Sequence, residues 1–325
     1  MTRTCAHWVA ALTIMTAALG ATAQQVVDAN YQPRVAQASY GSAQGPLVCI
    51  DGGHHNFHNI DGSFEPFGKL LRADGYVTRA LSGSFGAAAV GRTLQGCAIL
   101  VIANAQPTAE PWDSYPYPTP TAFTADETAT LKAWVQAGGA LLLIADHMPL
   151  AGAAAALAGA FGFGFNDGFA ARDFQTEAEG QAAFAAPQMF ERQNSTLREH
   201  PATSGRTPAD RVERIRAFIG QAITLPAQAR ALLVLPEDFI SLMPRKAWQF
   251  TLSTPKVAVG GWAQAGTLEL GRGRVAAFGE AGMFTAQFTG PDRKPMGLNA
   301  PGAEQNPTFI LNLMRWLAGS GVTTP

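Results

Sequence analysis

The sequence predicts an α/β fold: a mostly parallel, doubly wound sheet with helices on both faces, packed as a three-layer sandwich. Two observations predict it. Continuous apolar runs recur along the front half of the chain, and stretches with helical spacing alternate with them. Parallel strands buried on both faces have continuous apolar runs, and alternation with helices is typical of this architecture. The 325 residues, 47% of them hydrophobic, suffice for one large domain.

The first residues are typical of an export signal. Arg3 gives a positive start, residues 8–20 are apolar, and residues 21–23 match an A-x-A cleavage site. The apolar stretch is shorter than the roughly 20 residues that a membrane span needs. We therefore predict a signal peptide over 1–23, no integral membrane span after cleavage, and a periplasmic or secreted protein. A retained membrane anchor is the alternative.

The predicted elements follow in order after a polar linker over 24–44. A single domain over 45–320 begins with strands at 46–51, 76–81, 98–103 and 140–145 and with helices at 64–74 and 149–161. Thr124 and Glu127 match a capping box, which predicts a helix from there to Gly138. An irregular insertion is expected around 165–230, where 208–217 is either a short helix or a polar strand pair. Strands at 231–235 and within 256–280, and a helix at 306–318, complete the domain.

Two cysteines remain beyond the predicted signal peptide, Cys49 and Cys97. An oxidising compartment permits a disulfide. However, Cys49 lies near the end of one predicted strand and Cys97 at the start of another. In parallel neighbours this puts the thiols roughly 15 Å apart, which is too far for a bond. We therefore expect two buried free thiols.

Polar side chains gather where the predicted strands end. Ligands of open α/β sheets bind outside the carboxyl ends of the strands. Four of the six histidines fall there, the exceptions being His7 and His200. The residues at these ends are Asp51, His54, His55, Asn56, His58, Asn104, Gln106, Asp146, His147, Glu237, Asp238 and Glu280.

These residue types suit a metal-assisted or acid/base site. Neutral imidazoles together with carboxylates bind zinc and other divalent metals. The predicted metal ligands are His54, His58 and His147; the predicted catalytic residues are Asp146, His147 and Glu280; the predicted substrate-binding residues are Asp51, Asn56, Asn104, Gln106 and Trp112. The alternative is structural, with aspartates capping helices and histidines filling polar turns. Trp112 belongs to a proline-rich loop that we expect to form a lid or pocket wall.

Several other functions are not supported. The net charge is −1 and the basic residues are scattered, so nucleic acid is not an expected partner. The chain has no G-x-S-x-G elbow, no P-loop and no C-x-x-C motif.

Three segments carry a family resemblance. GGALLLIADHMP, GRGRVAAFGEAGMF and NPTFILNLMRWLAG resemble the class I glutamine amidotransferase-like superfamily, closest to its uncharacterised exported branch and similar to trehalose-utilisation-type proteins. The resemblance implies a flavodoxin-like fold. It also implies that the turn at Asp146 and His147 occupies the active-site position, where that family has its cysteine. Glu280 lies where such proteins often have an acidic residue. Because no cysteine stands at this turn, glutaminase activity is not implied.

Together these observations predict an exported hydrolase-type enzyme that acts on a small polar or carbohydrate-like substrate. The alternative is a non-catalytic ligand-binding or scaffold domain of the cell envelope that has the fold without the nucleophile.

Overall fold

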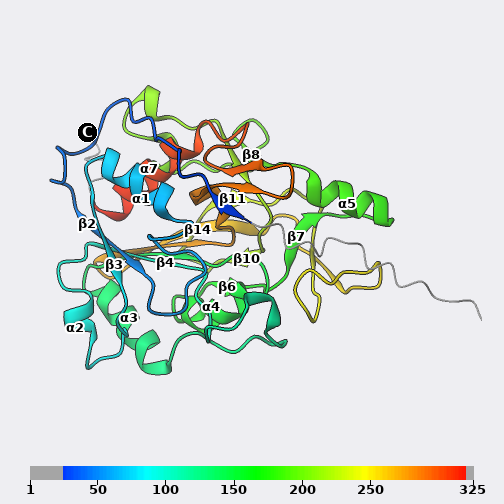
Figure 1. The fold of residues 1–325 in the computed structure, drawn as a ribbon, viewed down its shortest axis with the longest axis horizontal. Coiled ribbons are helices and arrows are strands. Elements are labelled where there is room, and N and C mark those ends of the chain that lie inside the picture. Colours follow the sequence, from blue (N-terminus) through cyan, green and yellow to red (C-terminus); the bar gives the residue numbers. More distant parts are fainter. Residues whose placement is uncertain (1–24, 320–325) are drawn as a thin grey trace, which may run out of the picture.

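The computed structural model describes residues 25–319, apart from the side chain of Trp112 (Figure 1). The predicted signal peptide over 1–23 lies outside the described residues. Within them, no helix has the length and apolar character to cross a membrane.

A nine-stranded sheet forms the centre of the described chain. Five parallel strands lie side by side in the order β3 (Val77–Leu81), β2 (Leu47–Asp51), β4 (Ile99–Ala103), β5 (Ala140–Ile144) and β15 (Gly273–Phe278). The sheet continues through β14 (Ala263–Leu270), which is antiparallel to β15. Both β10 (Ile223–Thr224) and β11 (Arg230–Val234) pair with β14, and β6 (Gly164–Phe165) pairs with β10 at the edge. The predicted α/β architecture with a mostly parallel sheet is confirmed.

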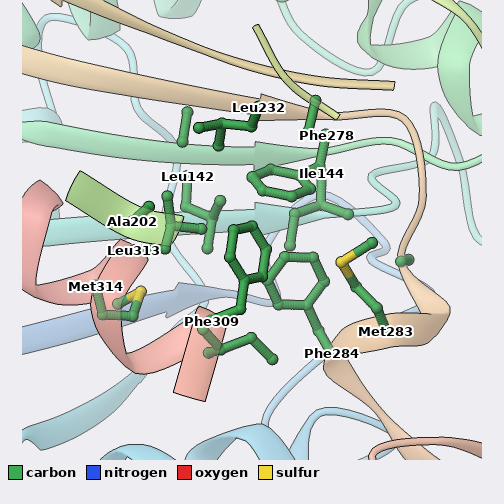
Figure 2. Packing of buried hydrophobic residues seen from close by; sticks show 14 of the residues in the cluster. Leu142, Ile144, Ala202, Leu232, Phe278, Met283, Phe284, Phe309, Leu313 and Met314 are labelled. Carbon is green, nitrogen blue, oxygen red and sulfur yellow. The ribbon is translucent and has the colours of Figure 1, made fainter. Parts of the chain in front are cut away.

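Helices cover both faces of this sheet. Figure 1 shows α1 (Glu65–Ala73) and α7 (Asn306–Leu317) on one face, and α2 (Val90–Thr93), α3 (Ala125–Gln136) and α4 (Leu150–Ala160) on the other. Successive side chains of each strand point to opposite faces. In β5, Leu142 and Ile144 therefore pack with Phe309 of α7 (Figure 2), whereas Leu141 and Leu143 join the core beneath α3 and α4.

Local signals in the sequence determine where α3 begins. The Thr124 hydroxyl accepts the N–H of Glu127, and the Glu127 carboxylate accepts the N–H of Thr124 at 3.0 Å, so the predicted capping box is confirmed. Leu131 and Val135 lie one turn apart on the buried face of the helix.

The remaining elements are small. The predicted insertion contains β7 (Phe169–Arg172), α5 (Glu177–Ala185), β8 (Gln188–Glu191), α6 (Pro201–Ser204) and β9 (Arg214–Ala217). The stretch 208–217 is a 3₁₀ turn followed by a strand. β7 pairs with β12 (Phe239–Leu242), which also pairs with β13 (Lys256–Ala258), and β8 pairs with β9. A third small sheet consists of β1 (Val26–Val27), β16 (Ala286–Thr289) and β17 (Lys294–Gly297).

Residues 25–44, which belong to the segment predicted as a linker, contact the rest of the domain. β1 pairs with β16, and the N–H of Ser39 donates to Asp74 at 2.7 Å. Lys69 donates to the carbonyl of Ala29 at 3.0 Å. The segment makes these contacts through its main-chain groups, which its polar side-chain composition does not reveal.

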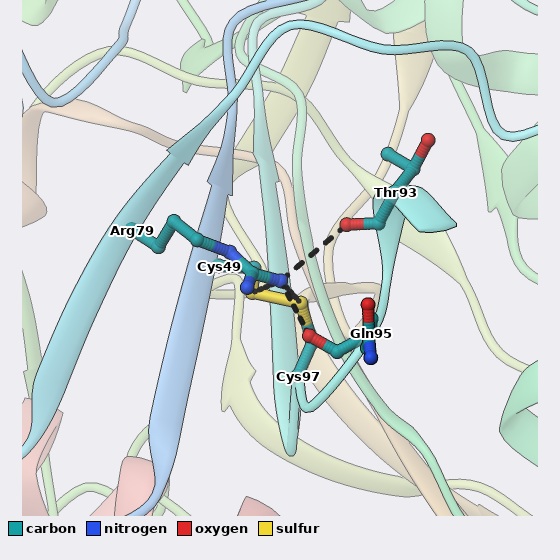
Figure 3. Close-up of a disulfide and its surroundings, with 5 residues drawn as sticks. All are labelled: Cys49, Arg79, Thr93, Gln95 and Cys97. Carbon is teal, nitrogen blue, oxygen red and sulfur yellow. Dashed lines mark hydrogen bonds between the residues drawn. A yellow bond between two sulfur atoms is a disulfide. The ribbon is translucent and has the colours of Figure 1, made fainter. Parts of the chain in front are cut away.

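The prediction of two free thiols is wrong, because Cys49 and Cys97 form a disulfide with Cα atoms 5.8 Å apart (Figure 3). Cys49 lies in the middle of β2, opposite Leu100. Cys97 lies before β4 rather than within it, in a turn where its N–H donates to the carbonyl of Leu94. The predicted distance assumed an extended chain at Cys97, whereas the turn brings this residue back toward β2.

Candidate active site at the carboxyl edge of the sheet

Asp146 and Glu280 are brought together by strand register. β5 and β15 are parallel neighbours in which Ile144 pairs with Phe278. Each acidic residue follows two positions after its member of this pair, so the two carboxyl groups leave the sheet side by side. Two of the predicted catalytic residues therefore share one place.

The chain around Glu280 is tightly packed. Its carboxylate accepts the N–H of Met283 at 3.0 Å and 3.2 Å, and the residue is fully buried. A Cβ on Gly282 would lie 2.6 Å from the carboxylate, and a Cβ on Gly220 would lie 2.1 Å from the carbonyl of Gly279. Glycine at these two positions allows main chain to surround the acid.

The two acids differ in charge. Burial raises the pKa of Glu280 well above its ordinary value, and the neighbouring charge of Asp146 raises it further. Burial also raises the pKa of Asp146, opposed by His147 and by main-chain N–H donors. Asp146 therefore ionises at a lower pH than Glu280. Among residues 25–319, neither acid has a lysine or arginine ion-pair partner.

Solvent reaches one of the two acids. Asp146 is partly exposed, whereas Glu280 is 0% exposed. The arrangement is a partly exposed carboxylate with a protonated acid behind it. Such a pair can accept a proton from a bound molecule and return it.

Asn104 positions the turn that carries Asp146. Its Oδ1 accepts the N–H of Asp146 at 2.9 Å, and its own N–H donates to the carbonyl of Ile144. Its backbone has a φ of 49°, in the left-handed region that asparagine tolerates better than most residues. Asn104 was predicted to bind substrate, and the contacts it makes are with the chain itself.

His147 points into an aromatic cluster. Its ring stacks on Phe169 with centroids 4.3 Å apart and meets Trp248 edge-on at 4.9 Å. Its Nδ1 donates to the carbonyl of Met148 at 2.8 Å. The imidazole therefore lies between a ring of β7 and a ring of the segment that joins β12 to β13.

His54 and His58 lie on opposite faces of the main sheet. The His54 ring packs between Phe85 and Phe123, at 4.8 Å and 4.7 Å, in the core beneath α3 and α4. The His58 ring stacks on Phe64 at 5.1 Å, in the core beneath α1. The loop between them crosses the end of the sheet.

The structure therefore does not bring the predicted metal ligands His54, His58 and His147 together. In the described part of the chain, no three His, Cys, Asp or Glu side chains are placed to hold a metal ion. Both ring nitrogens of His54 already contact carboxylates, with Nδ1 2.9 Å from Asp51 and Nε2 3.2 Å from Glu127.

The pKa values of the two histidines are shifted in opposite directions. Burial lowers the pKa of His54, but Asp51 and Glu127 outweigh it and raise the pKa above 6.5. Burial lowers the pKa of His58 to about 3. His54 thus links β2 to the first turn of α3, where two carboxylates favour its charged form, and His58 is a neutral core residue. Their roles are structural.

The other predicted binding residues hold the histidine loop. Asn56 Oδ1 accepts the N–H of His54 at 3.1 Å, and Asn56 Nδ2 donates to the carbonyl of Ala103. Gln106 Nε2 donates to the carbonyl of His55 at 2.8 Å. Asp51, besides contacting His54, accepts the N–H of Gly53. The side chain of Trp112 lies outside what the structure describes, so its predicted role stays a prediction.

One acidic residue near the site was missed. Asp167 Oδ1 accepts the N–H of Gly152 in the first turn of α4 at 2.7 Å. The main-chain N–H of Asp167 donates to Gln221, whose Nε2 donates to the carbonyl of Ala145, next to Asp146. Burial raises the pKa of Asp167 to about 7. The sequence Asn-Asp-Gly at 166–168 is a turn signal that marked this place.

His200, which the sequence left unassigned, caps α6. Its Nδ1 accepts the N–H of Ala202 at 3.1 Å, and its Nε2 lies 3.2 Å from the hydroxyl of Thr267. Burial lowers its pKa to about 4. His200 is therefore a neutral structural residue.

Comparisons with known proteins give likeness of fold. No protein-family model matches the sequence, and no curated protein matches it. The solved structure titled mmIFT52 N-terminal domain is similar, with a TM-score of 0.55 and 13% identity over 83% of this chain and 97% of that one. At this identity the similarity shows the fold alone.

Two further solved structures are more distant. A putative ThuA-like protein from Bacteroides uniformis has a TM-score of 0.41 and 11% identity, covering 86% of this chain and 94% of that one. A cytoplasmic protein from Salmonella typhimurium has a TM-score of 0.46 and 11% identity, covering 84% and 99%. ThuA-like proteins are thus among the structural neighbours.

Proposed function

We propose that this chain is an exported hydrolase-type enzyme with a glutamine amidotransferase-like, flavodoxin-like fold and without a cysteine nucleophile. Its acid/base site is the pair Asp146 and Glu280, and its substrate is a small polar or carbohydrate-like molecule. The observation that carries the proposal is this pair of adjacent acids, one partly exposed and one fully buried.

The strand order supports the proposed fold. Numbered along the chain from β2, the five parallel strands lie in the order 2-1-3-4-5, which is the flavodoxin-like arrangement. Asp146 follows β5, at the turn where the sequence resemblance implies a cysteine. The acid/base pair thus occupies the position that the resemblance implies for the reaction.

The electrostatics support a chemical rather than a structural role. Two adjacent acids without a lysine or arginine partner reduce the stability of the fold, because burial disfavours the ionised form of both and the charge of Asp146 disfavours ionisation of Glu280. Perturbed carboxyl groups of this kind are typical of acid/base sites. The Asp146 carboxylate would take a proton from an attacking water. Burial sustains the raised pKa of Asp146, and the buried Glu280 would lie behind it without touching the substrate.

The disulfide supports export. Cys49 and Cys97 are bonded, and disulfides form and persist mainly in oxidising compartments. The residues predicted as metal ligands do not fit a metal ion, so the proposed reaction has no step through one.

The test combines activity with stability. Asp146→Asn and Glu280→Gln are compared with wild type against a panel of chromogenic hydrolase substrates and, by melting shifts, against small polar ligands. We expect turnover to be lost in Asp146→Asn and strongly reduced in Glu280→Gln, with both variants at least as stable as wild type. Glu269→Gln, at an exposed position of β14, is the matched control.

The outcomes separate the alternatives. Turnover that survives in Asp146→Asn contradicts the assignment of the site. Binding without turnover, lost in both variants, would instead favour the non-catalytic ligand-binding domain.

A further inference from the structure

Arg79 of β3 reaches across β2 and lies over the disulfide (Figure 3). Its Nη2 is 3.0 Å from Cys97 Sγ and 3.4 Å from Cys49 Sγ. The same nitrogen donates to the carbonyls of Gln95 at 2.7 Å and Thr93 at 3.4 Å. One guanidinium therefore contacts both sulfur atoms and the turn that presents Cys97.

This cation has no anion beside it. Among residues 25–319 Arg79 forms no ion pair, and its Nε is buried without a hydrogen-bond partner. A partly buried charge normally has a counter-charge. A disulfide sulfur is only a weak acceptor, whereas a thiolate in the same place would accept a charge-assisted hydrogen bond.

We propose that Cys49–Cys97 is an exchangeable disulfide that a dithiol opens at Cys97, and that Arg79 is the positioning residue that stabilises the released thiolates. This inference is independent of the hydrolase proposal. Arg79 interacts more strongly with the reduced pair than with the bonded pair, so it favours opening and accelerates exchange.

The two sulfur atoms have distinct roles. Cys97 is partly exposed and Cys49 is fully buried, so an external thiolate attacks Cys97 Sγ. The bond between the sulfurs breaks, Cys49 leaves as a thiolate beside Arg79, and Cys97 forms a mixed disulfide with the reductant. The second thiol of the reductant, as its thiolate, then attacks the reductant sulfur and releases Cys97. The dithiol is oxidised to a disulfide, and its protons pass to solvent and to the two cysteine thiols.

The first experiment measures opening in the folded full-length chain. The protein is incubated with dithiothreitol in native buffer, free thiols are trapped with a maleimide polymer, and gel shifts give the rate. We expect the rate of disulfide opening to be proportional to the dithiothreitol concentration and faster than global unfolding. Arg79→Gln should slow the opening on the order of tenfold, and Arg79→Lys should retain most of the wild-type rate. Arg92→Gln, at an exposed arginine on α2, should leave it unchanged.

The second experiment needs no substitution of Arg79. In Cys49→Ala, the alkylation rate of Cys97 by iodoacetamide is followed against pH, in the folded state and in urea. We expect the pH midpoint of Cys97 alkylation to be lower in the folded state than in urea. In Arg79→Gln the folded midpoint should rise by about one pH unit, which corresponds to about a tenfold smaller thiolate fraction. The proposal is overturned if opening occurs only at the unfolding rate, if Arg79→Gln opens as fast as wild type, or if the folded midpoint equals the urea midpoint.

Discussion

Replacing Asp167 by asparagine should change how stability depends on pH. Burial raises the pKa of this carboxyl from 3.8 to about 7 in the folded chain. One pKa unit corresponds to about 1.4 kcal/mol. Ionisation of Asp167 at high pH therefore lowers the free energy of unfolding by about 4 kcal/mol. Asparagine has no charge to lose and retains an oxygen for the N–H of Gly152.

The sign follows from proton binding. Between pH 4 and pH 7 the folded chain retains the proton of Asp167 while the unfolded chain releases it, so this contribution to stability decreases as pH rises. It is fully present below pH 3.8 and is lost as pH rises through about 7. Relative to Asp167→Asn, wild type should therefore become less stable by about 1.4 kcal/mol per pH unit across this window.

Urea unfolding at several pH values between 4 and 8 measures this difference. Other titrating groups are shared by both proteins and cancel in the comparison. Asp61→Asn, at an exposed aspartate, is the control and should follow wild type. If the difference between wild type and Asp167→Asn stays constant within about 0.5 kcal/mol over the range, the reasoning about Asp167 is refuted.

Three further changes probe other parts of the structure. His54→Gln should lower the free energy of unfolding most below pH 6.5, and progressively less as pH rises through the raised folded pKa of His54. Urea unfolding measures this loss, and a loss that does not change with pH would contradict the prediction. Cys97→Ser opens a loop with a sequence separation of 48 and should lower the unfolding free energy by about 4 kcal/mol, and a loss below about 1 kcal/mol would contradict it. Gly220→Ala places a Cβ 2.1 Å from the carbonyl of Gly279 and should lower the melting temperature, whereas Gly159→Ala, in open space on α4, should raise it; equal effects would refute the packing argument.

The regular elements could be predicted because their signals are local. β5 is a run of apolar residues buried on both faces, and its predicted bounds of 140–145 differ by one residue from Ala140–Ile144. The capping box at Thr124 involves only neighbours in sequence. The sequence also predicted that Asp146 and Glu280 lie at the same edge of the sheet, because the carboxyl ends of parallel strands meet there.

The loops could not be predicted in this way. His54 and His58 are four residues apart, yet they enter cores on opposite faces, because the loop crosses the edge of the sheet between them. Glu127, which is 73 positions away from His54, occupies the second ring nitrogen of that residue. The disulfide depended on the turn before β4. Each outcome was determined by contacts between segments distant in sequence.

The most direct test of the account is a carbon NMR titration of the Glu280 carboxyl in wild type and in Asp146→Asn. We expect the titration midpoint of Glu280 in wild type to lie well above its ordinary value of 4.5, because the group is buried and Asp146 carries a neighbouring charge. In Asp146→Asn the titration midpoint of Glu280 should move to lower pH, because that charge is gone. A Glu280 midpoint at the ordinary value of 4.5 in wild type, or a midpoint that is unchanged in Asp146→Asn, would contradict the proposed acid/base pair.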